Sequence, residues 1–264
     1  MTHVRTPFDR IVDDIGSAGE QLTDLTACEG SAGNISVFTT HPLACPLEPA
    51  GEIDLPAPAP SLAGGWVVMT ASGSRLRDVG RRPAETVVAL RVHESGDAAT
   101  LHATPGARPS SEWNSHVAIH EDQRGRRGVE HHAVVHAQPM RLVFLSHLPE
   151  ITTSEELNER LMRWEPETAV VARDGVELAS FRVPGSREQM AATVQALARS
   201  SAVVWAKHGI VTRSDVSARI AADLVEYLEA AAQYEFMNLT IGSPAPGLTP
   251  EERGAVALAF GLGV

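Results

Sequence analysis

Two stretches, Ala133-Val134-Val135-His136 and Ala202-Val203-Val204-Trp205-Ala206-Lys207, predict the fold class. Both are compact apolar runs of strand length, and a histidine, His136 or His208, stands at the end of each. Strands are also predicted at residues 34–38, 66–70 and 169–172, and helices at 7–25, 112–120, 139–148, 186–198 and 215–239. Strands therefore alternate with helices along the chain, which predicts an α/β fold layered around one sheet.

The length of 264 residues is ample for one hydrophobic core, so a single domain spanning residues 1–264 is the simplest interpretation. Apolar residues make up 43% of the chain and charged residues 21%, which is ordinary globular composition and argues against wholesale disorder. Residues 41–65 are rich in proline and glycine, and we expect them to form an exposed loop.

The charge balance restricts the partners. The formal net charge is −11, with 33 acidic and 22 basic side chains, so the chain repels a polyanion such as nucleic acid. A small phosphate ester remains compatible, because backbone N–H groups and hydroxyls bind it locally. Cys28 and Cys45 are too few for a disulfide framework and fit a reducing compartment. Residues 1–27 resemble neither a signal peptide nor a membrane anchor, so we expect a cytoplasmic protein that does not bind membranes.

Three short motifs combine glycine with hydroxyl or amide side chains near predicted strand or helix ends. They are Gly33-Asn34-Ile35-Ser36, Thr70-Ala71-Ser72-Gly73-Ser74 and Pro109-Ser110-Ser111-Glu112. Each has the composition of an anion-binding turn. Each also has a plain structural interpretation: a Gly-Asn turn, a Ser/Thr turn, and a helix N-cap made by Ser110 and Ser111.

His136 and His208 both follow buried runs, so both can emerge at the same edge of the sheet. A lone histidine in such a place is more often a hydrogen-bonded structural residue. Two of them beside anion-type turns favour a metal site, because a divalent cation needs several imidazoles or carboxylates that converge from separate segments.

The motifs also carry a resemblance. Taken in chain order, the three glycine and hydroxyl motifs, Val134-Val135-His136 and Lys207-His208-Gly209 resemble the class II aldolase/adducin family over most of the chain. The segments Trp164-Glu165, Asp174-Gly175, Val183-Pro184-Gly185 and 203–210 are most similar to the members of that family that cleave rhamnulose 1-phosphate.

This resemblance implies a three-layer α/β/α sandwich around a central mixed or antiparallel sheet, and a cyclic homotetramer. It also implies a zinc ion held by His136, by the residue two positions further on, and by His208, with Glu112 as catalytic base. The residue two positions further on is Gln138, whose amide oxygen is a poorer zinc ligand than imidazole. Either Gln138 binds weakly, or Glu112 or one of His131, His132 and His147 completes the shell, or no metal is retained.

The resemblance further implies a phosphate site and a second acid. The phosphate of the substrate would lie against Asn34, Ser72, Gly73, Ser110 and Ser111, and Glu165 would act as a second acid or base in a neighbouring subunit. The implied function is that of a metal-dependent aldolase, a lyase that cleaves a ketose 1-phosphate such as rhamnulose or fuculose 1-phosphate into dihydroxyacetone phosphate and an aldehyde. The alternatives are a sugar-phosphate 4-epimerase or dehydratase of the same fold, and a metal-free, adducin-like interaction protein with a decayed site.

Overall fold

A nine-stranded sheet runs through the part of the chain that this computed structural model describes, residues 5–242 and 244–262. Residues 1–4, 243 and 263–264, which the single-domain prediction includes, lie outside the described residues. The strands are β1 (Asn34–Thr39), β2 (Pro49–Asp54), β3 (Trp66–Thr70), β4 (Val87–Val92), β5 (Ala98–His102), β6 (His131–Ala137), β7 (Glu177–Ala179), β8 (Ala202–Trp205) and β9 (Gly209–Ser214).

The strand order is β2-β5-β4-β3-β1-β6-β9-β8-β7. All neighbouring pairs are antiparallel except β7 and β8, which are parallel, so the sheet is mixed as predicted. The strands β1 and β6 lie side by side in its middle, with Asn34 opposite His136. This pairing places the Gly33–Ser36 motif beside the histidine at the end of β6.

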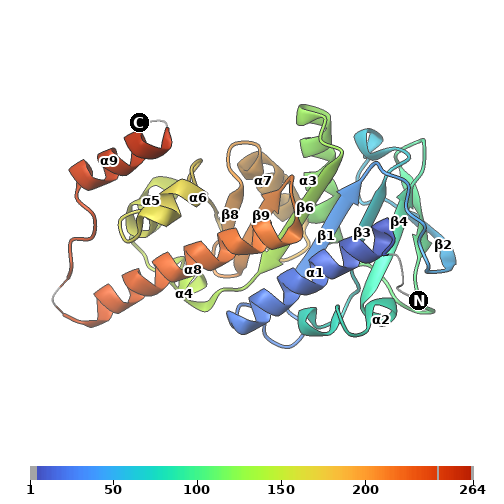
Figure 1. Cartoon of the computed structure of the whole chain (residues 1–264), viewed down its shortest axis with the longest axis horizontal. Helices are drawn as coiled ribbons and strands as arrows, with labels where there is room; N and C mark the ends of the chain where they lie inside the picture. Colours follow the sequence, from blue (N-terminus) through green and yellow to red (C-terminus); the bar gives the residue numbers. More distant parts are fainter. Residues whose placement is uncertain (1–4, 243, 263–264) are drawn as a thin grey trace.

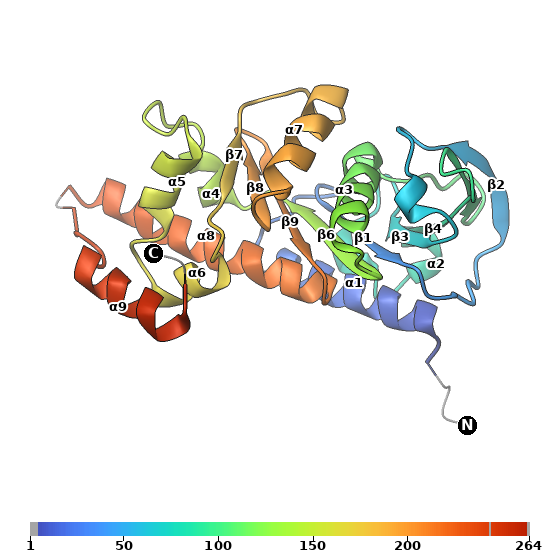
Figure 2. The ribbon, with the colours of Figure 1, turned by 90° about the horizontal axis from the view of Figure 1, so that it is seen from above.

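Helices cover both faces of the sheet, which gives the predicted α/β/α layers (Figures 1 and 2). In Figure 2 the long helices of one layer, at residues 7–24 and 218–240, lie on the opposite side of the strands from those at 113–127 and 187–197. The helices are α1 (Pro7–Asp24), α2 (Pro83–Thr86), α3 (Trp113–Arg127), α4 (Met140–Leu145), α5 (Ser154–Leu161), α6 (Pro166–Val171), α7 (Arg187–Leu197), α8 (Ala218–Thr240) and α9 (Pro250–Phe260), with short 3-10 turns η1 (Pro60–Leu62) and η2 (Leu76–Asp78).

The alternation of side chains along β6 explains the layers. Ala133, Val135 and Ala137 pack into the core on the side of α1 and α8. Val134 packs on the other side, against Ile119 of α3 and Leu197 of α7. Because successive side chains of a strand point to opposite faces, His132 and His136 share the α3 side with Val134. From Ala133 to Ala137 one face of β6 is therefore apolar, whereas the face toward α3 carries His132 and His136.

Two predictions about elements were wrong. Residues 41–65 are not simply an exposed loop, because they contain β2 and η1 and bury Leu43, Leu55 and Leu62. The strand β2 lies at the sheet edge, where Pro49, Gly51 and charged side chains are tolerated, so its sequence resembles a loop. Residues 169–172 were predicted as a strand but belong to or follow α6, since a short apolar run cannot distinguish the two and Pro166 begins a helix there.

Candidate metal and active site

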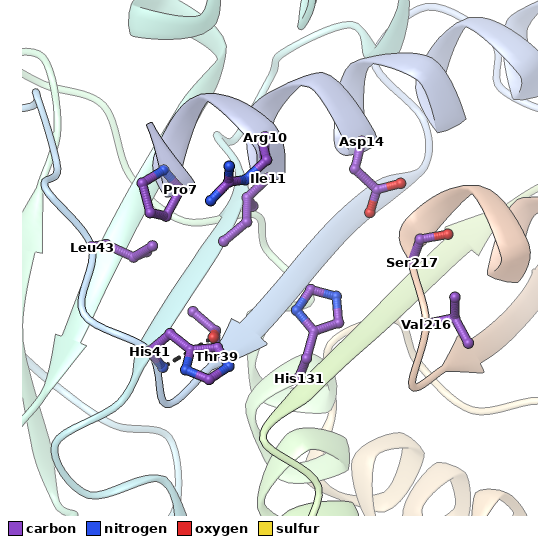
Figure 3. A pocket seen from close by; sticks show the side chains of 10 residues that line it. All are labelled: Pro7, Arg10, Ile11, Asp14, Thr39, His41, Leu43, His131, Val216 and Ser217. Carbon is purple, nitrogen blue, oxygen red and sulfur yellow. Dashed lines mark hydrogen bonds between the residues drawn. The ribbon is translucent and has the colours of Figure 1, made fainter. Parts of the chain in front are cut away.

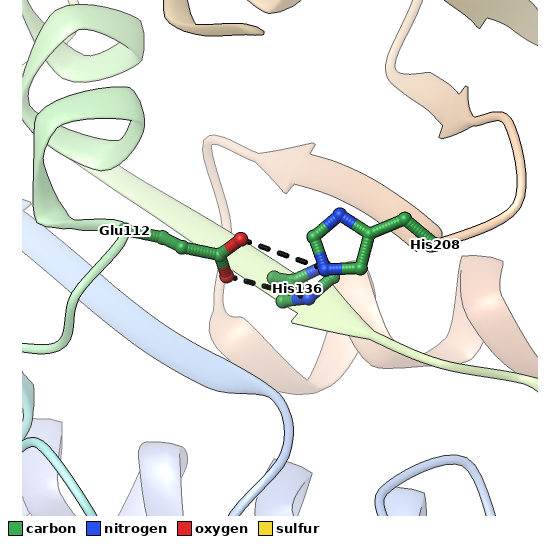
Figure 4. A group of neighbouring side chains, drawn as sticks. All are labelled: Glu112, His136 and His208. Carbon is green, nitrogen blue, oxygen red and sulfur yellow. Dashed lines mark ion pairs between the residues drawn. The ribbon is translucent and has the colours of Figure 1, made fainter. Parts of the chain in front are cut away.

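Glu112, His136 and His208 converge at one point, and each comes from a different segment. His136 stands near the end of β6, His208 lies in the turn between β8 and β9, and Glu112 is the residue before α3. The Nε2 atom of His136 lies 3.4 Å from Oε2 of Glu112, and Nε2 of His208 lies 3.6 Å from Oε1 (Figure 4). One ligand atom from each of the three residues lies within 4.8 Å of the other two.

Glycines allow the segments to approach this closely. A Cβ atom on Gly209 would lie 2.5 Å from the carbonyl oxygen of Ala137 and 2.7 Å from Cε1 of His136. Gly33 has a φ of +79°, and a Cβ atom there would lie 3.0 Å from the carbonyl oxygen of His136. The glycines on both sides of His136 are therefore needed for its ring to reach the site.

A hydrogen bond determines which nitrogen of the His136 ring carries a proton. Its Nδ1 lies 3.0 Å from the carbonyl oxygen of Ile210, which can only accept, so Nδ1 carries the proton. Nε2 is the ring nitrogen that faces the Glu112 carboxylate. A backbone carbonyl on the far nitrogen is the usual support for a metal-binding histidine.

The electrostatics favour an ionised Glu112 and a neutral His208. Burial raises the pKa of Glu112, but His136, the hydrogen bond from Asn34 and His208 offset it, and the pKa lies below its usual range. Burial and the neighbouring His136 lower the pKa of His208, although Glu112 opposes them. A buried carboxylate that faces two imidazole nitrogens is stabilised by a cation between them.

An unpaired atom at the site agrees with a cation at this position. Oε1 of Glu112, which faces Nε2 of His208, is buried and has no hydrogen-bond partner among the described residues. Two imidazole nitrogens and one carboxylate oxygen are a common donor set for divalent transition metals. The residues present therefore fit a divalent cation.

Glu112 is the third residue of the group that could hold a metal ion, whereas His131, His132 and His147, the other histidines considered for completing the shell, lie outside it. His147 is exposed, His131 is partly buried at the start of β6, and His132 directs its Nδ1 to His120. Gln138 is partly exposed just after β6, and a Cβ atom on Gly209 would lie 3.3 Å from its Cγ. Its amide therefore lies close to the turn that carries His208.

The three glycine and hydroxyl motifs come together beside these donors. Ala71 forms an isolated bridge with Pro109, and the N–H of Ser72 donates to the carbonyl of Arg108 at 2.8 Å. The hydroxyl of Thr70 accepts from the N–H of Ile35 at 3.2 Å, which joins the first motif to the second. Ser72, Gly73 and Ser111 are exposed, and Ser110 is buried.

The N-cap predicted for Ser110 and Ser111 was wrong. Glu112 occupies the N-cap position of α3, and no side chain caps that helix. The hydroxyl of Ser110 accepts only a long hydrogen bond, 3.5 Å, from the N–H of Glu112. The two serines therefore have hydroxyl capacity that is not used by the helix.

Asn34 and Glu165 lie in different surroundings. Asn34 is buried, and its Nδ2 donates to Oε2 of Glu112 at 3.0 Å. Glu165 is the N-cap of α6, next to Trp164, whose Nε1 donates to Glu235 of α8. Among the described residues, Glu112, His136 and His208 form the group that could hold a metal ion, and Glu165 does not belong to it.

A separate hollow of about 390 Å³ lies near the start of β6, at the opposite end of this strand from His136 (Figure 3). Arg10, Asp14, His41 and His131 line it, and of these only His131 was considered from the sequence, as a residue that could complete the metal shell. The hollow and the donor group are therefore distinct features.

Sequence reasoning missed a buried cluster behind Glu112, although it had singled out Ser36 as part of the first motif and His132 as a possible metal ligand. It consists of Ser36, His116, His120 and His132, all fully buried and joined by hydrogen bonds. The signal was available in the spacing, since Glu112, His116 and His120 are four residues apart on one helix face.

The fold and the site define a class, that of α/β proteins in which two imidazoles and a carboxylate meet at the sheet beside three motifs rich in glycine and hydroxyl groups. The family model for the class II aldolase and adducin N-terminal domain matches residues 13–236, and the chain belongs to this family. The family and the fold predicted from the sequence are both confirmed.

Two curated relatives and one solved structure show the range of similarity. The rhamnulose-1-phosphate aldolase of Bacteroides thetaiotaomicron is 26% identical over 262 residues, which cover 98% of this chain and 97% of that protein. The enzyme of the same name from Yersinia pseudotuberculosis is 29% identical over 213 residues, 79% of this chain and 76% of that protein. The crystal structure of a sugar-phosphate aldolase from Thermotoga maritima has a TM-score of 0.78 at 27% identity and covers 91% of this chain and 99% of that one.

Proposed function

We propose that this protein is a metal-dependent lyase that cleaves a ketose 1-phosphate, such as rhamnulose or fuculose 1-phosphate, into dihydroxyacetone phosphate and an aldehyde. The observation that carries the proposal is the convergence of Glu112, His136 and His208 from three distant segments. Family membership and the names of the relatives support carbon–carbon lyase chemistry on sugar phosphates.

The donor group would hold a divalent cation, with zinc as the predicted ion. His136 and His208 would bind through Nε2, and the Gln138 amide would be a further, weaker ligand. A cation held there would act as a Lewis acid on the carbonyl and hydroxyl oxygens of the substrate.

Glu112 is the proposed catalytic base. Its lowered pKa keeps it ionised near neutral pH, and Oε1 has no hydrogen-bond partner among the described residues. This oxygen would take the proton when it is not itself bound to the cation. Oε2 is held by Asn34. Glu112→Gln keeps the shape but removes the base, and we expect it to lower kcat by about 10²–10⁴-fold.

The phosphate group would lie in the cradle formed by the three motifs, against Ser72, Gly73, Ser110 and Ser111. Asn34 belongs to the same proposal, because only one of its two Nδ2 hydrogens is required by Glu112. Glu165 is proposed as an acid or base that reaches the site of a neighbouring subunit in a homotetramer. The cytoplasmic location also remains a prediction; among the described residues, no helix has the length and apolar character needed to span a membrane.

The test combines metal content with turnover. Metal in the purified protein is measured by mass spectrometry in the wild type, His136→Ala and Gln138→His, with release of dihydroxyacetone phosphate from rhamnulose and fuculose 1-phosphates as the second readout. We expect stoichiometric metal in the wild type and its loss in His136→Ala. His147→Ala is the matched control, because His147 is exposed and outside the donor group.

Two outcomes contradict the proposal. A wild type that binds no metal, while Gln138→His does, indicates a decayed site and the adducin-like alternative. A metal-loaded wild type that releases no dihydroxyacetone phosphate but converts a sugar phosphate in another way indicates an epimerase or a dehydratase.

A further inference from the structure

A continuous chain of hydrogen bonds leads from Glu112 into the protein interior, between α3 and the strands β1 and β6. Beyond Asn34, the ring of His116 lies between Asn34 and Ser36, with Nε2 against Oδ1 of Asn34 and Nδ1 2.6 Å from Oγ of Ser36. Oγ of Ser36 lies 2.8 Å from Nε2 of His120. Nδ1 of His120 lies 2.8 Å from Nδ1 of His132, where the chain ends.

All three rings in this chain are neutral at physiological pH. Burial lowers the pKa of His116 and of His132 to about 3, and it lowers that of His120 well below the usual value. A neutral imidazole has one donor nitrogen and one acceptor nitrogen. If one nitrogen of a ring donates its hydrogen bond, the other nitrogen of that ring must therefore accept one.

The carboxylate sets that direction. Ionised Glu112 only accepts, so Asn34 must present Nδ2 to it and Oδ1 to His116. Nε2 of His116 then carries the proton, and its Nδ1 accepts from the hydroxyl of Ser36. The Ser36 oxygen in turn accepts from Nε2 of His120.

The last bond follows in the same way. Nδ1 of His120 has no proton left to give, so it accepts from Nδ1 of His132. The remaining nitrogen of His132, Nε2, is then a lone pair, and it is buried without a hydrogen-bond partner. If every hydrogen bond of the chain ran the other way, Nε2 of His132 would be a buried N–H without a partner, and Oδ1 of Asn34 would face the Glu112 carboxylate. Both ends of the chain would then cost free energy.

We propose that Ser36, His116, His120 and His132 are positioning residues, which form a one-way hydrogen-bond chain that holds the Asn34 amide toward Glu112 and so fixes the Glu112 carboxylate against His136 and His208. This role rests on the proposed function of the site. It requires that the ring tautomers follow one pattern throughout.

The first test reads the tautomers directly. Long-range ¹H–¹⁵N spectra of the full-length protein, labelled selectively at histidine and recorded at pH 7 after removal of metal, identify which ring nitrogen carries the proton. We expect Nε2–H in His116 and His120 and Nδ1–H in His132. The opposite pattern, or protonated rings, overturns the proposal. The measurement needs neither metal nor substrate, so it gives its answer even if the proposed function fails.

The second test breaks the chain at its middle. Ser36→Ala removes the hydroxyl between the two α3 histidines, and we expect zinc affinity, measured by competition with a chelator, to fall by roughly 10- to 100-fold, as for other partners behind metal ligands. Ser36→Thr retains the hydroxyl and is expected to restore most of the affinity. Ser115→Ala is the matched control, because Ser115 is equally buried and its hydroxyl has no partner among the described residues.

A Ser36→Ala protein that folds, keeps the wild-type tautomer of His116 and binds zinc as tightly as the wild type contradicts the proposal. If Ser36→Ala does not fold, the tautomer pattern of the wild type still decides. If the wild type binds no zinc but shows the expected tautomers, the hydrogen-bond chain stands and the proposed function fails.

Discussion

At the scale of single residues, the site depends on a glycine that carries no chemistry. Gly209 begins β9 directly after His208, and a side chain there would collide with the backbone of β6 and with the His136 ring. Gly209→Ala is therefore expected to destabilise the protein by about 1–3 kcal/mol and to abolish metal retention, because β9 must move away from β6. Urea unfolding and metal content measure the two effects.

Gly254→Ala is the control for this substitution. Gly254 lies in α9, and nothing lies within 4 Å of a Cβ atom placed there. The change should alter stability by no more than about 1 kcal/mol, in the favourable direction expected for alanine in a helix, and leave metal content unchanged. Equal effects at both positions would contradict the steric explanation.

At the scale of elements, α8 holds the start of α4 through a buried acid. Pro139 precedes α4 and provides no side-chain cap, so the N–H groups of Arg141 and Leu142 donate to Glu229 of α8 at 3.1 and 2.9 Å. Glu229→Ala leaves both donors unpaired, and we expect a loss of about 2–4 kcal/mol in the free energy of unfolding. Denaturant unfolding at pH 7 measures it.

Glu226, three residues earlier on α8, is exposed and makes one hydrogen bond, with Gln21. Glu226→Ala is expected to cost about 0.5 kcal/mol or less. A comparable loss of stability in Glu229→Ala and Glu226→Ala would show that a negative charge anywhere on this part of α8 has the same effect, and that Glu229 does not act as a cap for α4.

The elements also show how far the sequence predicts this fold. The strands β1, β3, β6 and β8 carry continuous apolar or β-branched runs, and all were predicted. The strands β4, β5, β7 and β9 and the helix α5 were not predicted, and β2 was taken for loop. For β2, β5 and β7, which are exposed or half-buried, partners far along the chain decide whether the segment becomes a strand. The apolar run of β4 is buried and was overlooked. The sequence predicted which residues are candidate metal ligands, but not which of them lie together in space. Whether Glu112 or Gln138 stands opposite the two histidines depends on how α3 docks on β6.

At the scale of the whole molecule, buried neutral histidines make stability depend on pH. His116 and His132 have a pKa of about 3 in the folded protein, against about 6.5 when unfolded. Below pH 6.5 the unfolded chain binds protons that the folded chain does not, so the stability is complete above that pH and is lost as the pH falls toward 3. Between pH 7 and pH 5 the loss is about 2 kcal/mol for each of the two histidines.

Urea unfolding at pH 7, 6 and 5 measures this loss. The lowered pKa values of His131 and His208 act in the same direction, whereas that of Asp215 affects stability only at more acidic pH. His132→Phe should reduce the slope of the free energy of unfolding against pH by the amount that corresponds to about one proton. His147→Ala, at an exposed position, should leave that slope unchanged. A stability independent of pH in this range would show that the rings are charged or accessible in the folded protein.

The strand order has a consequence for synthesis on the ribosome. Four strands of sequence lie between β1 and β6, and β9, whose carbonyl at Ile210 selects the free nitrogen of His136, is translated later still. A nascent chain that has not yet released residues 208–214 has neither His208 nor that carbonyl, so it cannot capture a cation in the native arrangement. High contact order of this kind makes folding slow, and any metal loading must follow it.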